Sequence, residues 1–155
     1  MGRSQKDNIE PFVIALHKAV FAMDRGIDRL LAERFELTFS QFFILRVLAK
    51  RPGTTQKAIA GARGLTEAAV SRSVDLLLGK RLITRKVNPS NRREHMLVLT
   101  KEGTRIELRA RSAALGKVDA ALTKISDAER KTLARAAEKL LDAFGGERDP
   151  LCTSS

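Results

Sequence analysis

Residue types that build catalytic and metal sites are scarce in this 155-residue chain, which has one cysteine, Cys152, and two histidines, His17 and His95. A single cysteine excludes an internal disulfide framework and a cysteine-only metal site, and two histidines supply a zinc or catalytic cluster poorly. The sequence also has no Ser-His-Asp arrangement, glycine-rich phosphate loop or metal-ligand spacing. We therefore expect neither an enzyme nor a bound metal or cofactor.

Long apolar runs are missing as well. A membrane-spanning helix needs about 18 to 20 apolar residues in succession, whereas the apolar runs of this chain are short and interrupted by charge. The first residues have no signal-peptide pattern, so we expect a cytoplasmic protein without a membrane partner. The composition, with 30% charged and 43% hydrophobic residues, is typical of one globular domain rather than of a disordered chain.

Basic residues are in excess, and the excess lies in the middle of the chain. Lysine and arginine number 29 against 18 acidic residues, a net charge of +11. Residues 46–93 alone hold twelve basic and two acidic residues, while the flanking segments are nearly balanced. Such a segment suits a polyanion, because neutralised phosphates release condensed counterions. A solvated basic face is the alternative; a membrane surface fits less well, because the segment lacks the Trp or Phe face of an interfacial helix.

The two ends of the chain have helical patterns. Apolar residues at steps of three and four predict one long amphipathic helix from Ile9 to about Phe35. After Thr100 a similar pattern predicts a helix of about 24 residues, roughly 36 Å long. Ser126 and Glu129 have capping-box spacing and open a last helix.

These long helices each have an apolar stripe that must be buried. They are separated in sequence by the basic segment, so the economical arrangement packs them against each other and against a second copy. We therefore expect a twofold homodimer, with a monomeric bundle as the alternative.

The middle of the chain has shorter elements. Thr38 and Gln41 have capping-box spacing and begin a helix that stops at Pro52-Gly53. Two short helices follow, over residues 55–62 and from Thr66 to about Gly79. Beyond them, two strands are predicted.

The strands are predicted at residues 82–87 and 96–100. Residues 88–91 are Asn-Pro-Ser-Asn, a turn-rich sequence that would join the strands in a hairpin with a long loop. The hairpin would be strongly basic.

The two short helices match a helix-turn-helix, with Ala60, Gly64 and Val70 at its relative positions 5, 9 and 15. Ala60 allows a close helix crossing, Gly64 can adopt the left-handed conformation of a tight turn, and Val70 packs the second helix on the first. Thr66 suits the N-cap of that second helix. A basic hairpin immediately after this motif would be a wing.

This order of elements resembles the MarR family of winged helix-turn-helix transcription regulators over about residues 8–145. The residues most specific for the resemblance are Asn91-Arg92-Arg93 followed by Leu97-x-Leu99-Thr100-x-x-Gly103, similar to the family's Asp-Arg-Arg wing tip and Leu-Thr-x-x-Gly start of a dimerisation helix.

Two positions depart from the family pattern. Asn91 replaces the acidic residue of the wing tip, so a charge pair with the tip arginine would become a neutral hydrogen bond. Arg81 stands where a glycine usually ends the recognition helix, so this helix would stop sooner, near Gly79, or be capped differently.

The resemblance implies a mainly α fold with a small β-hairpin wing, that is, a winged helix-turn-helix with long N- and C-terminal dimerisation helices. We expect an N-terminal dimerisation helix in residues 1–37 and a DNA-binding lobe in residues 38–100. C-terminal dimerisation helices would occupy residues 101–146, followed by a flexible tail, residues 147–155.

Double-stranded DNA is the partner that the resemblance implies, with the helix from Thr66 in a major groove. There Arg72 would bind guanine, Ser71 a base or phosphate, and Ala68 or Ala69 a thymine methyl, although Arg72 could instead form a surface ion pair with Asp75 or Glu67. The wing would reach the minor groove. The expected DNA-binding residues are Thr55, Gln56, Lys57, Thr66, Ala68, Ala69, Ser71, Arg72, Arg85, Arg92 and Arg93.

Proteins that resemble this chain often bind a small anionic or aromatic effector in a cleft beside the dimer helices, and binding there lowers DNA affinity. The residues that could line such a cleft are His17, Met23, Phe42, Phe43 and Arg46. His17 is as well explained as a partly exposed helix residue, and the aromatic residues as core. Cys152 lies in the tail and is a poor redox switch.

Two functions remain open at this point. The first is a sequence-specific dimeric transcription regulator, a repressor of palindromic operators that a small molecule relieves. The second is a non-specific architectural DNA-binding protein, which would bind random DNA as tightly as its best site.

Overall fold

The computed structural model describes residues 9–63, 66–89 and 91–145. Its fold is mainly helical with one two-stranded antiparallel sheet, which confirms the winged helix-turn-helix fold predicted from the sequence. In chain order its elements are α2 (Ile9–Phe35), α3 (Phe39–Lys50), α4 (Gln56–Arg63), α5 (Glu67–Gly79), β1 (Ile83–Asn88), β2 (Asn91–Leu99), α6 (Lys101–Leu122) and α7 (Asp127–Ala143).

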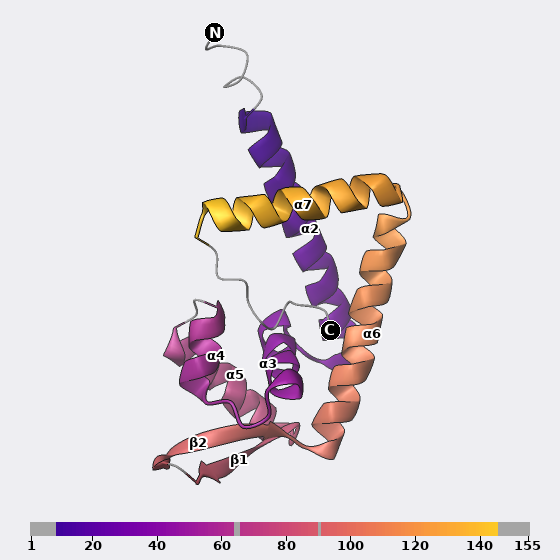
Figure 1. Ribbon diagram of the computed structural model, residues 1–155. Helices are drawn as coiled ribbons and strands as arrows, with labels where there is room; N and C mark the ends of the chain where they lie inside the picture. Colours follow the sequence, from indigo (N-terminus) through magenta and orange to yellow (C-terminus); the bar gives the residue numbers. More distant parts are fainter. Residues whose placement is uncertain (1–8, 64–65, 90, 146–155) are drawn as a thin grey trace.

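The elements form two regions, joined by α6 (Figure 1). Helices α3, α4 and α5 and the hairpin make a lobe at one end of the chain's fold. At the other end α7 crosses α2, and α6 runs from the hairpin up to α7. None of the described helices is long and apolar enough to cross a membrane.

Side-chain caps fix where several helices begin. The Gln41 amide N–H donates to Thr38 Oγ1 over 3.2 Å, and the Thr38 N–H donates to Gln41 Oε1 over 3.1 Å. The same reciprocal pattern joins Ser126 and Glu129 at the start of α7. Thr66 Oγ1 accepts from the Ala69 N–H at the start of α5. Because a cap satisfies backbone N–H groups that have no partner within the helix, these three predicted starts are confirmed.

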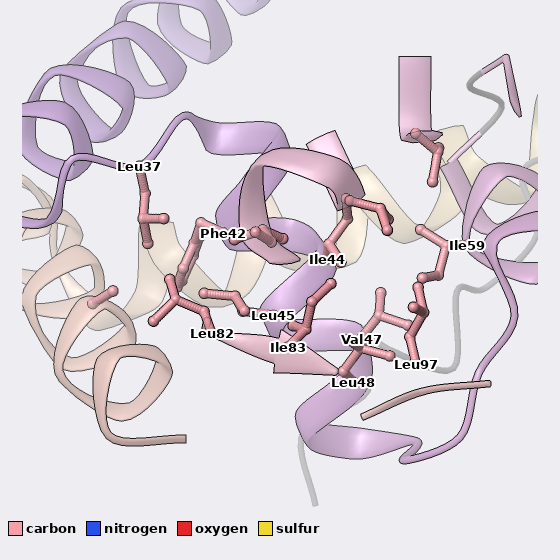
Figure 2. Close-up of a cluster of buried hydrophobic side chains, with 14 of the residues drawn as sticks. Leu37, Phe42, Ile44, Leu45, Val47, Leu48, Ile59, Leu82, Ile83 and Leu97 are labelled. Carbon is pink, nitrogen blue, oxygen red and sulfur yellow. The ribbon is translucent and has the colours of Figure 1, made fainter. Parts of the chain in front are cut away.

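The hydrophobic core of the lobe is built around α3 (Figure 2). Helix α3 is buried on most sides, with α5 and the base of the hairpin on one part of its surface and α6 and α2 on another. The core residues from the helix-turn-helix and the base of the hairpin are Ile59, Ala60, Val70, Val74, Leu77, Leu82, Ile83 and Leu97. Ala60 and Val70 are therefore buried as the helix-turn-helix requires, while Gly64, the predicted turn residue, lies outside the described residues.

The hairpin differs from its prediction. Strand β2 begins at Asn91, not at Met96, and β1 extends to Asn88, so the predicted long loop is wrong. Val87 pairs with His95 and Asn88 with Asn91, with an irregularity between Val87 and Asn88. The outer part of the hairpin projects away from the core, so neither face requires apolar residues and the alternating pattern of a half-buried strand is missing there.

The end of α5 and the start of α6 meet at one tightly bonded junction. Arg81 has a φ of 56°, and the N–H groups of Arg81 and Leu82 donate to the carbonyls of Leu78 and Leu77. Arg81 thus occupies the left-handed position where glycine usually ends a helix. The Thr100 N–H donates to the Leu82 carbonyl over 3.0 Å, and the Thr100 hydroxyl donates to the Arg81 carbonyl over 2.8 Å.

Gly103 makes this junction possible. A Cβ at that position would lie 1.9 Å from the Leu82 carbonyl oxygen, well inside any allowed contact. Only a glycine therefore lets the first turn of α6 approach the backbone that connects α5 to the hairpin.

The outer helices leave apolar surface uncovered. Helix α7 has no buried residue, and the first half of α2 is almost entirely exposed. Between them lies an apolar groove of about 860 Å³. The exposed large apolar residues of these two helices are Ile9, Phe12, Val13, Ile14, Val20, Phe21, Met23, Leu133 and Leu141. A single copy of the chain thus leaves a wide apolar surface in contact with water.

Candidate nucleic-acid interface

Helix α5 presents a polar and small-residue face to solvent, as its pattern predicts. Val70, Val74 and Leu77 are buried in the core of the lobe. Of the remaining residues, Glu67, Ala68, Arg72 and Asp75 are exposed, and Ala69 and Ser71 are half-buried. Leu65, which the sequence predicts to face the core, lies outside the described residues.

Arg72 lies free on this face. It forms no ion pair or hydrogen bond within the described part of the chain, so the alternative of an ion pair with Asp75 or Glu67 is wrong. Asp75 instead accepts a hydrogen bond from the Arg85 guanidinium over 3.0 Å. This pair joins α5 to β1 and leaves the Arg72 guanidinium available for an external acceptor.

A cleft of about 400 Å³ lies where α4, α5 and the hairpin meet. It brings together four residues that the sequence assigned to DNA and three that it did not, Glu67, His95 and Leu97. The lining residues are Thr55, Gln56, Lys57, Glu67, Arg85, His95 and Leu97. Thr55 caps α4 by accepting the Ala58 N–H over 3.3 Å. The positive end of α4 and the Lys57 and Arg85 side chains make the cleft suitable for an anion.

The alternation of side chains along β2 could have identified His95 as a residue of this cleft. Leu97 is buried, and alternate residues of a strand point to the same face. His95, two residues earlier, is therefore on the face of β2 that turns toward α4 and α5.

Three expected DNA contacts remain, two near the tip of the wing and one at the start of α5. Arg92 and Arg93 are on β2, close to the turn, but their side chains lie outside what the structure describes. Thr66 has its hydroxyl engaged as the cap of α5.

The five residues expected to line an effector cleft do not form one site, and Phe43 is half-buried against the core of the lobe. Phe42 is buried in the core of the lobe, and Met23 is exposed on α2. His17 lines the groove between α2 and α7. Arg46 lies elsewhere, on α3 against α6.

Arg46 forms a partly buried ion pair with Glu107 of α6. Its guanidinium donates to Glu107 Oε1 over 2.7 Å, and the Arg111 Nε lies 3.9 Å from the same oxygen. The Glu107 side chain is only 3% exposed, whereas Arg46 is 27% exposed. These residues line a second cleft, of about 430 Å³, between α3, β2 and α6. An ion pair thus joins the lobe to α6 beside an open, cationic cleft.

The fold and this surface define a DNA-binding protein of the winged helix-turn-helix class. Helix α5 has a free arginine on its outer face, and the hairpin and a cleft lined by Lys57 and Arg85 lie beside it. Both features are those of a lobe that enters a major groove and contacts the adjacent phosphates.

Comparison with known proteins identifies the family. The MarR family profile matches residues 35–94. A Thauera aromatica protein, whose name describes a transcriptional regulatory protein for the hcr operon, is 30% identical over 118 residues, covering 76% of this chain and 71% of that protein. This chain belongs to the MarR family; it is a DNA-binding transcription regulator and not an enzyme.

Solved structures agree on the fold. The crystal structure of a MarR family transcription regulator, 23% identical, superposes with a TM-score of 0.82 and covers 91% of this chain and 93% of its own. The transcriptional repressor CouR, bound to a 23-mer DNA duplex, is 25% identical, with a TM-score of 0.75 and coverage of 90% of this chain and 97% of its own.

Proposed function

We propose that this protein is a dimeric, sequence-specific regulator that represses transcription from palindromic operators. The observation that carries the proposal is the exposed Arg72, which lies on the outer face of α5 without a partner in the described part of the chain. An arginine free to bind guanine O6 and N7 is the commonest specific contact in a major groove. The repressor role is supported by CouR, a transcriptional repressor of the same fold that binds a DNA duplex. The proposed location is the cytoplasm.

The uncovered apolar faces of α2 and α7 support the proposed dimer. Helix α7 has none of its residues buried in a single copy, and a second copy could cover both α7 and the first half of α2. Residues 1–37 and 101–146 would then form the dimerisation region, residues 38–100 the DNA-binding lobe and residues 147–155 a tail. Light scattering on the purified protein should give the mass of two chains; the mass of one would refute this part of the proposal.

Each expected DNA contact has a proposed role. Arg72 reads guanine, Ser71 contacts a base or phosphate, and Ala68 or Ala69 packs on a thymine methyl. Thr55, Gln56, Lys57 and Thr66 lie at the starts of α4 and α5 and hold phosphates with side-chain or backbone donors. Arg85 adds a phosphate contact, and Arg92 and Arg93 reach the minor groove.

We propose that a small-molecule effector relieves repression by binding in the cleft that Arg46 lines. The charged residues of this cleft are Arg46, Lys50, Glu107 and Arg111, and the remainder is mainly apolar. A small anion with an apolar or aromatic body matches that lining. By competing with Glu107 for Arg46, it would change how the lobe is held on α6, and this differential binding is what a regulatory ligand requires.

Selection of duplexes from a random pool tests sequence specificity. A dimer with two recognition helices about 34 Å apart should select a palindrome whose half-sites are about one helical turn apart. Binding constants on the selected duplex and on a scrambled one should then differ by about a thousandfold or more. A ratio near one would favour the architectural alternative, in which the basic surface holds DNA of any sequence.

A further inference from the structure

The cleft between α4, α5 and the hairpin contains a histidine that the proposed contacts do not use. His95 is exposed on β2, where it pairs with Val87 of β1. Its strand brings it next to Lys57 of α4, Glu67 of α5 and Arg85 of β1, which line the same cleft.

Among the described residues that line the cleft, the fixed charges around His95 cancel when the Asp75 partner of Arg85 is counted. Lys57 and Arg85 are cationic, Glu67 is anionic, and Arg85 is paired with the anionic Asp75. With a neutral imidazole the group therefore has no net charge, although it lies in the most basic part of the chain. A proton on His95 would make the cleft cationic and add a second N–H donor.

We infer that His95 binds a backbone phosphate of DNA when its imidazole is protonated, so that DNA affinity rises as the pH falls. The inference rests on the proposal that this cleft faces the DNA. Histidine is the side chain that ordinarily changes charge between pH 5 and 8. Because the ligand is a phosphate, the contact is independent of base sequence.

The chemistry of the cleft favours a phosphate over a base edge. His95 belongs to the wing and lies beside the capped start of α4, whereas the base-reading face is on the exposed side of α5. Helix starts and wing strands contact the sugar-phosphate backbone next to the groove that the recognition helix occupies.

The test measures binding of the full-length protein to a fluorescent duplex of mixed sequence, about 30 base pairs long, between pH 5.5 and 8. The affinity of the wild-type protein should rise about tenfold or more as the pH falls, the effect of a charged hydrogen bond in each protomer. The slope of log K against log salt should steepen at low pH by about 0.9 for each protomer.

Two substitutions of His95 make the test specific. His95→Gln keeps a hydrogen-bonding side chain without the charge, and should bind at pH 5.5 as the wild type binds at pH 8. His95→Lys keeps a positive charge throughout, and should bind at pH 8 nearly as well as at pH 5.5. Because position 95 is exposed on the hairpin, both replacements should be tolerated. Circular dichroism at each pH checks that the variants are folded.

Two further variants are controls. His17→Gln removes the other histidine, which lies in the groove between α2 and α7, and should leave the wild-type pH profile unchanged. Glu67→Gln should raise affinity at every pH because an anion leaves the cleft, while the pH dependence persists.

The inference is overturned if His95→Gln and wild type share one pH profile and one salt slope. It is also overturned if affinity falls with falling pH, or if Glu67→Gln abolishes the pH dependence, because His95 would then pair with Glu67 rather than with phosphate. Because the duplex contains no operator, this test does not depend on the outcome of the selection experiment. A protein that selects no palindrome can still have the contact between His95 and phosphate.

Discussion

Removal of Arg46 should destabilise the protein strongly, because Arg46 neutralises a buried carboxylate. Arg46→Met keeps much of the side-chain volume but leaves Glu107, 3% exposed, with only the Arg111 Nε at 3.9 Å. Breaking a buried ion pair costs about 3–5 kcal/mol. Arg46 is itself 27% exposed and Arg111 remains close, so we expect about 2–3 kcal/mol.

Urea unfolding followed by circular dichroism measures this loss, at one fixed protein concentration because the stability of the proposed dimer would depend on concentration. Thermal unfolding should show a decrease in Tm of about 4–12 °C for a chain of this length. The double variant Arg46→Met/Glu107→Leu should recover most of the lost free energy of unfolding, because it leaves no unpaired charge buried.

Arg105→Met is the matched control. Arg105 pairs with Glu102 on the surface of α6, where both side chains are about half exposed. The hydrogen bond from Arg105 lowers the pKa of the Glu102 carboxyl, but exposed pairs contribute little to stability. If Arg46→Met were no more destabilising than Arg105→Met, or if the double variant were less stable than Arg46→Met alone, the assignment of Arg46 as the neutralising partner would be refuted.

Three further substitutions test the junction and the recognition helix. Gly103→Ala places a Cβ against the Leu82 carbonyl and should lower the free energy of unfolding by about 3 kcal/mol, measured by urea unfolding. Arg81→Gly should raise the free energy of unfolding in the same assay by about 0.5–1 kcal/mol, because glycine adopts a φ of 56° without strain. Arg72→Ala should relax base preference at one operator position in each half-site, a loss of about 1–3 kcal/mol of discrimination measured by repeating the duplex selection.

Controls for these variants are available in the same chain. A Cβ added at Gly79, at the end of α5, would lie in open space. Gly79→Ala should therefore leave the free energy of unfolding unchanged or slightly higher, in contrast to Gly103→Ala. Arg135→Ala removes an exposed charge from α7, far from the lobe, and should select the wild-type site. An unchanged site for Arg72→Ala would contradict its role in base readout, and a less stable Arg81→Gly would contradict strain at that residue.

Helix positions could be predicted well because their signals are local. Thr38, Thr66 and Ser126 lie within a few residues of the N–H groups that they cap, so sequence spacing alone determines the geometry. The outer face of α5 follows equally from the helical period. The length of β2 could not be predicted, because its first residues pair with β1 without a buried face to impose an alternating pattern.

The sites that join distant segments could be predicted only in part. Arg46 and Glu107 are 61 residues apart, and nothing near either residue indicates the other. The cleft at His95 needs α4, α5 and both strands in place before its residues meet. The residues expected to line an effector cleft lie on α2 and α3, and tertiary packing separates Phe42 in the core from His17 in the outer groove and Arg46 in the ion pair with α6.

The junction at Leu82, Thr100 and Gly103 turns α6 into a lever. Only Thr100 separates β2 from α6, and its hydrogen bonds clamp the hairpin to the helix start. At 1.5 Å per residue the 22-residue helix is about 33 Å long. If α6 pivots by about 10° about the end farthest from the hairpin, the end that joins the wing moves by roughly 6 Å. That displacement is about half the width of a major groove, so in the proposed dimer a slight change in how the two copies cross would suffice to take both wings out of register with DNA.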